Sequence, residues 1–93
     1  MRGGLQVTSD AVALRYQKTS EVPRFAFVVP TKVDKRATQR NRMRRILSES
    51  VRLLLPDIAG TDGVFIIRKN IAKLSQQDIK NIATDLLHSA KLL

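Results

Sequence analysis

A run of positive charge at the head of an amphipathic segment constrains this chain more than any other feature. Residues 32–45 hold seven Lys or Arg side chains and a single acid, Asp34, so they carry +6 of a net charge of +9. Cations packed this densely repel one another, and the pattern is typical of a surface that binds an anionic partner; a merely solvated basic face is the alternative. Five of the seven are Arg, which suits bidentate phosphate contacts. The cations are Lys32, Lys35, Arg36, Arg40, Arg42, Arg44 and Arg45.

The basic run continues into a predicted helix. Over residues 38–55 the apolar side chains recur at helical spacing, which predicts one buried stripe. We expect Thr38 to be the N-cap and Pro56 to end the helix. Arg40 lies on the apolar side but one turn before the first core residue, where burying it unpaired would be costly. We therefore expect the helix to overhang the sheet, with Arg40 and Arg44 projecting into a groove.

The place of these cations within the helix also points to an anion. The first turns of a helix are the positive end of its dipole, where each cation is disfavoured by about 0.3–1 kcal/mol. A bound phosphate reverses that effect, because the free N–H groups and the arginines then act together. The nearest acids, Asp34 and Glu49, are too few to neutralise seven cations. The sequence therefore predicts a site for a nucleic-acid backbone.

Three apolar segments predict strands. Residues 5–16 and 24–29 have strand-like patterns, and residues 63–68 read as a third, buried strand. The segment 24–29 is apolar on both sides, which predicts a central strand covered on each face, and its expected partner is a hairpin with 5–16. A last helix begins at Ser75, where Asp78 completes a capping box.

The order strand, strand, helix, strand, helix predicts a single domain over residues 1–93. We expect an α/β (α+β) two-layer sandwich in which helices cover a small mixed β-sheet. By the general rule the strand–helix–strand crossover is right-handed, and nothing in the residues overrides that rule.

Composition excludes several classes of function. The chain has no Cys, and its one His, His88, is predicted on the exposed face of the last helix, so neither a thiolate nor a histidine metal site is expected. Scattered acids and four isolated glycines provide neither a two-metal nuclease site nor a phosphate-binding loop. No run reaches the ~18 apolar residues of a membrane span, and we expect no secretion leader. We expect a cytoplasmic protein with no catalytic residue of its own, no membrane partner and no small-molecule substrate.

Aromatic side chains on the predicted sheet offer a second kind of nucleic-acid contact. Phe25 and Phe27 share one side of their strand and are most simply core residues, with base stacking on the sheet as the alternative. Tyr16 is the better candidate for a surface residue that stacks on a base.

Residues 32–45, KVDKRATQRNRMRR, resemble the signature of the bacterial ribonuclease P protein subunit. In that family a Lys/Arg-Ala-x-x-Arg-Asn-Arg-x-(Lys/Arg)-Arg run opens a central helix after a strand. The preceding RFAFVVPTK is similar to the family's Arg-Phe-Gly-Phe-x-Val-x-x-Lys stretch, and the GVFIIR strand and last helix match in position. The resemblance covers residues 4–93. Asp34 and Lys35 depart from a commoner Val-Gly type of approach, and the family's long N-terminal helix is not predicted here.

The resemblance implies the non-catalytic protein component of the ribonuclease P endoribonuclease. Such a subunit binds the ribonuclease P RNA and precursor tRNA and assists removal of the 5′ leader, while the RNA subunit performs the Mg²⁺-dependent hydrolysis. It implies a left-handed crossover, as in the second domain of a small-subunit ribosomal protein. The implied RNA-binding residues are Lys32, Lys35, Arg36, Arg40, Asn41, Arg42, Arg44 and Arg45; candidates for the leader cleft are Tyr16, Phe25 and Phe27.

Two other hypotheses remain at this point. A ribosomal or other structural RNA-binding protein with a similar fold would share the composition, though it would not require the motif. An autonomous nuclease would need a cluster of acids that the sequence lacks.

Overall fold

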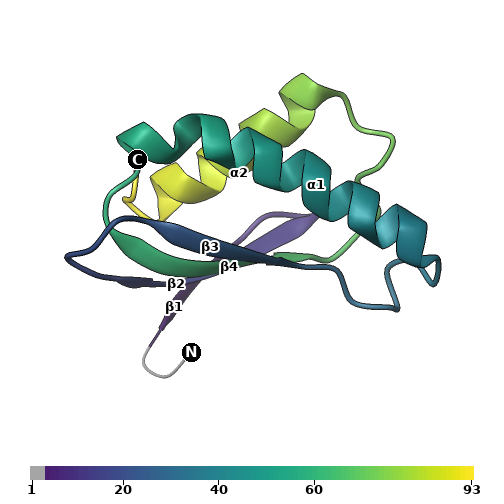
Figure 1. Cartoon of the computed structure of the whole chain (residues 1–93), viewed down its shortest axis with the longest axis horizontal. Helices are drawn as coiled ribbons and strands as arrows, with labels where there is room; N and C mark the ends of the chain where they lie inside the picture. The colour runs from purple at the N-terminus through teal and green to yellow at the C-terminus, as the bar shows by residue number, and fades with distance from the viewer. Residues whose placement is uncertain (1–3) are drawn as a thin grey trace.

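The computed structural model describes residues 4–93 and has two layers, with both helices on one side of a four-stranded sheet (Figure 1). This confirms the predicted α+β sandwich. In chain order the elements are β1 (Leu5–Thr8), β2 (Val12–Lys18), β3 (Arg24–Val28), α1 (Ala37–Leu54), the 3₁₀ turn η1 (Leu55–Asp57), β4 (Thr61–Ile67) and α2 (Gln76–Ser89).

The sheet is mixed, as predicted, but its strand pairing differs from the expected one. The strand order is β1-β2-β4-β3, with β1–β2 and β2–β4 antiparallel and β3–β4 parallel. The expected hairpin between residues 5–16 and 24–29 is therefore wrong. Instead, the first segment itself folds into a hairpin, because Ser9 turns the chain: its backbone N–H donates to the Val12 carbonyl at 2.8 Å, and its Oγ accepts from the Val12 N–H at 3.2 Å.

Strand β3 lies at an edge of the sheet, so the prediction of a central strand is also wrong. The strands with neighbours on both sides are β2 and β4. In β4, Thr61, Gly63, Phe65 and Ile67 are buried toward the helices and the alternate residues are half-buried. In β3 only the side that carries Phe25 and Phe27 packs against the core. As a result, the outward-facing residues of β3 stay exposed.

The crossover from β3 through α1 to β4 is left-handed. In Figure 1 the chain runs along β3 at the near edge of the sheet, returns through α1 above it, and runs along β4 behind β3 in the same direction as before. The general expectation of a right-handed crossover fails here, and the handedness implied by the family resemblance is confirmed.

The core lies between the two layers. Helix α1 buries Met43, Leu47 and Val51, while α2 buries Ile79, Ala83, Leu86 and Leu87, so both predicted stripes are confirmed. They cover Leu14 and Phe65, which are fully buried at neighbouring positions of β2 and β4.

The helix ends were predicted with unequal success. The capping box of α2 is present: Ser75 Oγ accepts from the Asp78 N–H, and the Asp78 carboxylate accepts from the Ser75 N–H. Thr38 is not the N-cap of α1, because the helix starts at Ala37 and its N-cap is Arg36, which makes no side-chain cap. Within residues 4–93 no helix is long and apolar enough to cross a bilayer.

Candidate nucleic-acid interface

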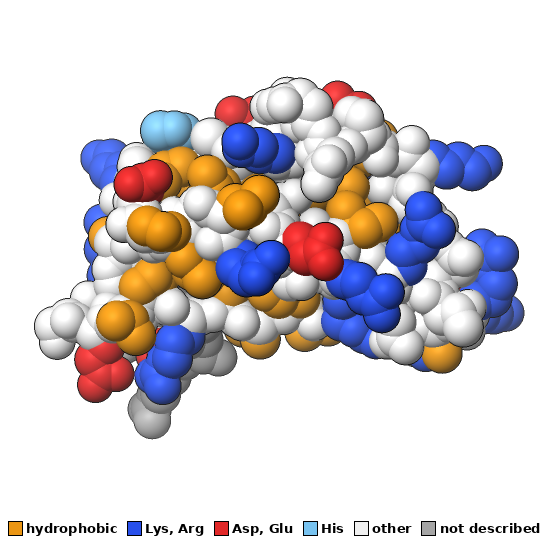
Figure 2. Space-filling view, turned by 45° about the horizontal axis from the view of Figure 1, so that its top comes forward, with side chains coloured by type: hydrophobic (Ala, Val, Ile, Leu, Met, Phe, Trp, Pro, Cys, Tyr) orange, Lys and Arg blue, Asp and Glu red, His pale blue; other side chains and the backbone are white. Residues whose placement is uncertain are grey.

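The basic residues gather at one end of the molecule. In Figure 1 the first turns of α1 extend past the ends of the strands, as the predicted overhang requires, and Figure 2 shows Lys and Arg side chains clustered at that end. We call residues Lys32 to Arg45 the basic end. Of the predicted RNA-binding residues at this end, Lys32, Lys35, Arg36, Asn41, Arg42 and Arg45 are exposed, whereas Arg40 and Arg44 are half-buried.

Most of the charge at the basic end has no internal counterion. Of its seven cations, only Arg36 forms an ion pair within the described part of the chain, and its partner is Asp34. The first turn of α1 contains no acidic residue. The helix dipole and the arginines therefore act in the same direction, and both favour an anion at this end.

Asp34 organises the loop that leads into α1. Its Oδ1 accepts from the Arg36 backbone N–H at 2.9 Å and from Arg36 Nε at 3.1 Å, while Oδ2 accepts from Arg36 Nη2 at 2.9 Å and from Asn70 Nδ2 at 3.2 Å. The Asp34 side chain is only 8% exposed. Hydrogen bonds from the Arg36 side chain and then from its backbone N–H lower the pKa of Asp34 to about 2, and the same contacts raise the pKa of Arg36. The loop is thus tied both to the helix start and to the segment after β4.

Arg40 does not project into a groove as predicted. Its Nη1 donates to the carbonyl oxygens of Asp34 at 3.0 Å and Lys35 at 2.8 Å. A cation on the apolar side of the helix needs hydrogen-bond acceptors, and the loop carbonyls supply them. Arg44 instead donates to the Asn41 side-chain oxygen one turn earlier. Arg42 and Arg45 point away from the core and make no ion pair in the described chain.

A second feature is a groove between α1 and the β3 edge. It has a volume of about 370 Å³ and is lined by Pro23, Arg24, Phe25, Phe27, Ser48, Val51, Arg52 and Leu55. Phe25 and Phe27 are half-buried and pack on Phe65, with ring centroids 5.2 and 5.4 Å apart. The two rings therefore belong both to the core and to the groove wall. Sequence reasoning missed Arg24 and Arg52 as residues of this groove.

Tyr16 lies in the core and not on the surface. It is 6% exposed on the helix-covered side of β2, so the proposal that it is a surface stacking residue is wrong. Its register partner on β4 is Gly63, whose other partner is Phe25 on β3. The glycine lacks a side chain, which leaves room for the aromatic rings on either side of it.

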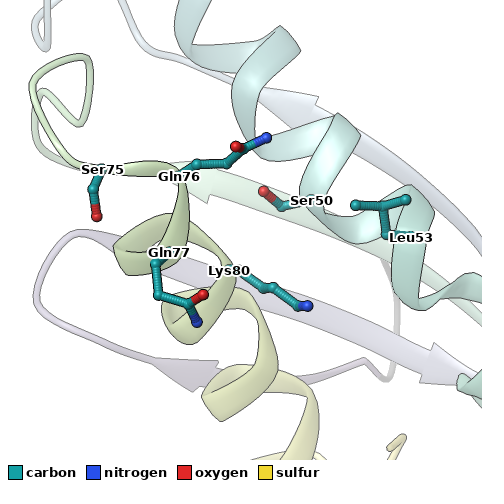
Figure 3. A pocket seen from close by; sticks show the side chains of 6 residues that line it. All are labelled: Ser50, Leu53, Ser75, Gln76, Gln77 and Lys80. Carbon is teal, nitrogen blue, oxygen red and sulfur yellow. The ribbon is translucent and has the colours of Figure 1, made fainter.

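A further hollow lies between α1 and α2, away from the basic end. It measures about 540 Å³ and is lined by Ser50, Leu53, Ser75, Gln76, Gln77 and Lys80 (Figure 3). Ser50 donates to the Ile46 carbonyl of its own helix, and no acid or histidine lines the hollow. His88 is exposed on α2, as predicted. Within residues 4–93 no three His, Asp or Glu side chains meet in a way that could hold a metal ion.

Comparison with known proteins gives a consistent family. A family model described as Ribonuclease P matches residues 1–91. The ribonuclease P protein component of Xanthomonas axonopodis pv. citri is 39% identical over 87 residues, covering 92% of this chain and 60% of the relative. That of Xanthomonas euvesicatoria pv. vesicatoria is 38% identical with the same coverage. The chain thus spans about three fifths of the length of these curated relatives.

Solved structures share the fold. The RNase P protein from Thermotoga maritima superimposes with a TM-score of 0.83 at 23% identity, covering 95% of this chain and 84% of that chain. The Staphylococcus aureus RNase P protein gives a TM-score of 0.81 at 22% identity, covering 96% of this chain and 83% of that chain.

Proposed function

Because the chain belongs to the ribonuclease P protein family, we propose that it acts as the protein subunit of ribonuclease P in the cytoplasm. In this role it binds the catalytic RNA and precursor tRNA and assists removal of the 5′ leader. The RNA subunit carries out the hydrolysis and uses Mg²⁺ to do so. The protein contributes binding and positioning and supplies no catalytic residue.

The observation that carries this proposal is the largely unneutralised basic end. Six of its seven cations form no ion pair within the described chain, and the Arg40-Asn41-Arg42 motif lies on the overhanging turns of α1. Arg42 is free to reach a phosphate, while Arg40 holds the loop from which Lys32 and Lys35 extend. If about six phosphates are engaged, the logarithm of the binding constant should fall against that of salt concentration with a slope of about −4 to −5.

The groove beside β3 supports the leader-binding part of the proposal. Single-stranded RNA is bound by aromatic rings that stack on bases together with cations that contact phosphates, and each stacked base contributes about 1–3 kcal/mol. Phe25 and Phe27 provide rings in the groove wall, and Arg24 and Arg52 provide the cations. Arg24 is shared with Asp62, whose Oδ1 accepts from its Nε at 3.1 Å, so Arg52 is the more available of the two.

The test is cleavage of precursor tRNA by a bacterial ribonuclease P RNA at low Mg²⁺, with and without the protein. Faster release of the 5′ leader only when RNA and protein are both present is the expected result. Tight binding to the RNA without faster cleavage would support the contact with the RNA subunit and contradict the role in positioning the leader. Equal affinity for ribosomal RNA fragments and no stimulation would overturn the proposal in favour of a general RNA-binding protein.

A further inference from the structure

Asp34 is the single acid among the seven cations of the basic end. An acid weakens a surface that attracts an anion, because it repels phosphates and neutralises a neighbouring cation. Asp34 is not a solvated acid, however, since its side chain is only 8% exposed and its carboxylate accepts four hydrogen bonds. Each oxygen accepts two of them, which uses both lone pairs of each oxygen.

The hydrogen bonds of Asp34 join the loop before α1 to two other segments. Arg36, the N-cap of α1, donates through its backbone N–H and its guanidinium. Asn70, in the segment after β4, donates through Nδ2 to Asp34 Oδ2 at 3.2 Å. The Asn70 amide is held in this orientation because its Oδ1 accepts from the Ala72 N–H at 2.8 Å. Asp34 therefore links the loop both to the helix and to the end of the sheet.

The segment after β4 is itself a fixed support. Ile71 is 1% exposed, and its backbone N–H donates to Met43 Sδ in α1 at 3.5 Å. From the helix, Arg40 Nη1 donates to the backbone carbonyl of Asp34 at 3.0 Å. Both the side chain and the backbone of Asp34 are thus held, which fixes the loop relative to α1.

The exposed cations of the basic end lie on both of the parts that Asp34 joins. Lys32 and Lys35 lie on the loop, and Arg42 and Arg45 lie on α1. A folded RNA can engage both sets at once only if they keep one spacing. A loop that is already ordered also spares the complex the entropy cost of ordering it on binding.

We propose that Asp34 is a positioning residue for RNA binding, which holds the loop and the start of α1 in the arrangement that engages both sets of cations. The acid then raises RNA affinity in spite of its charge. The alternative is that Asp34 shields Arg36 and so weakens RNA binding. The two roles predict opposite signs for the removal of the carboxylate. This inference rests on the proposed RNA-binding function.

The first test is Asp34→Asn, read by the affinity of the folded protein for ribonuclease P RNA. The Asn amide group is a donor, so two of the four donors around Asp34 lose their acceptor whichever way the amide is turned. Charge alone predicts tighter binding, because the variant is more positive by one. We expect affinity to fall about three- to tenfold, as it would if only about a third to a tenth of the molecules held the binding arrangement.

Two controls separate positioning from charge and from stability. Glu49→Gln removes an exposed acid from α1 that forms no ion pair within residues 4–93, and it should leave RNA affinity unchanged or raise it. Ser75→Ala removes the cap of α2, away from the basic end, and should lower stability without changing RNA affinity. All affinities are measured well below the unfolding transition of each variant.

A second variant tests the same arrangement without any change of charge. Asn70→Ala removes the hydrogen bond from the segment after β4, and we expect it to weaken RNA binding about two- to fivefold. Its salt slope should stay within about 0.5 of the wild-type value, because the same phosphates are engaged once the arrangement forms. Combined with Asp34→Asn its effect should be less than additive. Asn81→Ala on α2 is the control, since Asn81 also accepts a side-chain hydrogen bond, from Gln77 at 2.9 Å.

Binding of the wild type is measured first, because its absence would overturn the proposed function and this inference together. If the wild type binds and Asp34→Asn binds equally or more tightly, with a salt slope steeper by about 1, Asp34 is a shield on Arg36 and not a positioning residue. If Asp34→Asn does not fold, Asn70→Ala decides the question, and an affinity equal to that of Asn81→Ala would refute the positioning role.

Discussion

Gly63→Ala is the sharpest probe of how the sheet positions the groove. Gly63 lies between Tyr16 on β2 and Phe25 on β3. A Cβ at this position would lie 2.7 Å from two ring carbons of Phe25 and 3.3 Å from Leu14 Cδ1. Gly63 does not use the left-handed backbone region, so the substitution tests side-chain crowding alone.

The magnitude follows from where the Phe25 ring can go. To reach a contact of 3.4 Å the ring must retreat by about 0.7 Å. Overpacking of an enclosed site costs about 1–3 kcal/mol, but Phe25 is half-buried and can move into the groove. The lower unfolded-state entropy of Ala returns about 0.4–1 kcal/mol. We expect a net loss of about 1 kcal/mol, which for a domain of this size lowers Tm by about 4–8 °C.

The assay is a double-mutant cycle with Phe25→Leu, read by thermal or denaturant unfolding. Because Leu is shorter and relieves the contact, the double variant should be more stable than the sum of the single effects predicts, by at least about 0.5 kcal/mol. Phe27→Leu is the control, since Phe27 pairs with Phe65 and not with Gly63. Gly63→Ala should also weaken binding of single-stranded leader RNA several-fold, with affinity for the RNA subunit unchanged.

Strict additivity of Gly63→Ala with Phe25→Leu would refute the reasoning. It would mean that the cost arises elsewhere, in Leu14 or in the strand backbone. If the two substitutions couple as expected but the affinity for leader RNA is unchanged, the packing argument is supported and Phe25 is not part of the leader site.

Three further predictions concern the basic end and α2. The pKa of Asp34 is lowered from 3.8 to about 2, so its carboxylate stabilises the fold above about pH 4, and this contribution is lost as the pH falls toward 2. Calorimetry should therefore show a steeper fall in Tm between pH 4 and pH 2 for the wild type than for Asp34→Asn. Arg42→Ala should reduce RNA affinity and lower the salt slope of binding by about 1, while the free energy of unfolding stays within about 0.5 kcal/mol of wild type. Arg40→Ala should reduce RNA affinity and also destabilise the protein by about 1 kcal/mol, because two loop carbonyls lose their donor. An unchanged Tm for Arg40→Ala would contradict the structural role. Ser75→Ala should cost about 0.5–2 kcal/mol through loss of the α2 cap, and a change in RNA affinity would show that the capping box does more than stabilise the helix.

Features encoded over a few neighbouring residues were predicted well from the sequence. The spacing of Met43, Leu47 and Val51 was enough to orient α1, because a helical stripe is a property of one segment. The Ser75–Asp78 capping box is likewise a contact over three residues. The density of cations in residues 32–45 predicted a basic surface, since seven charges and one acid cannot neutralise one another wherever the chain folds.

Other local signals were present but were outweighed. Ser9 and Asp10 are turn-forming residues within an otherwise strand-like stretch, and the hairpin between β1 and β2 turns there. Thr38 matched the preference for an N-cap, but Asp34 reaches the Arg36 backbone N–H from outside the helix and the helix begins earlier.

The order of the strands, the left-handed crossover and the surroundings of single side chains were decided by tertiary structure. Phe25 lies in an edge strand because β3 pairs with β4 alone. That pairing joins residues almost forty positions apart in the chain. The pairing of β2 with β4 buries Tyr16 beside Gly63, and the edge position of β3 leaves Ala26 exposed. Periodicity records which sides of a segment are apolar, whereas only the packed sheet determines which of those sides another element covers.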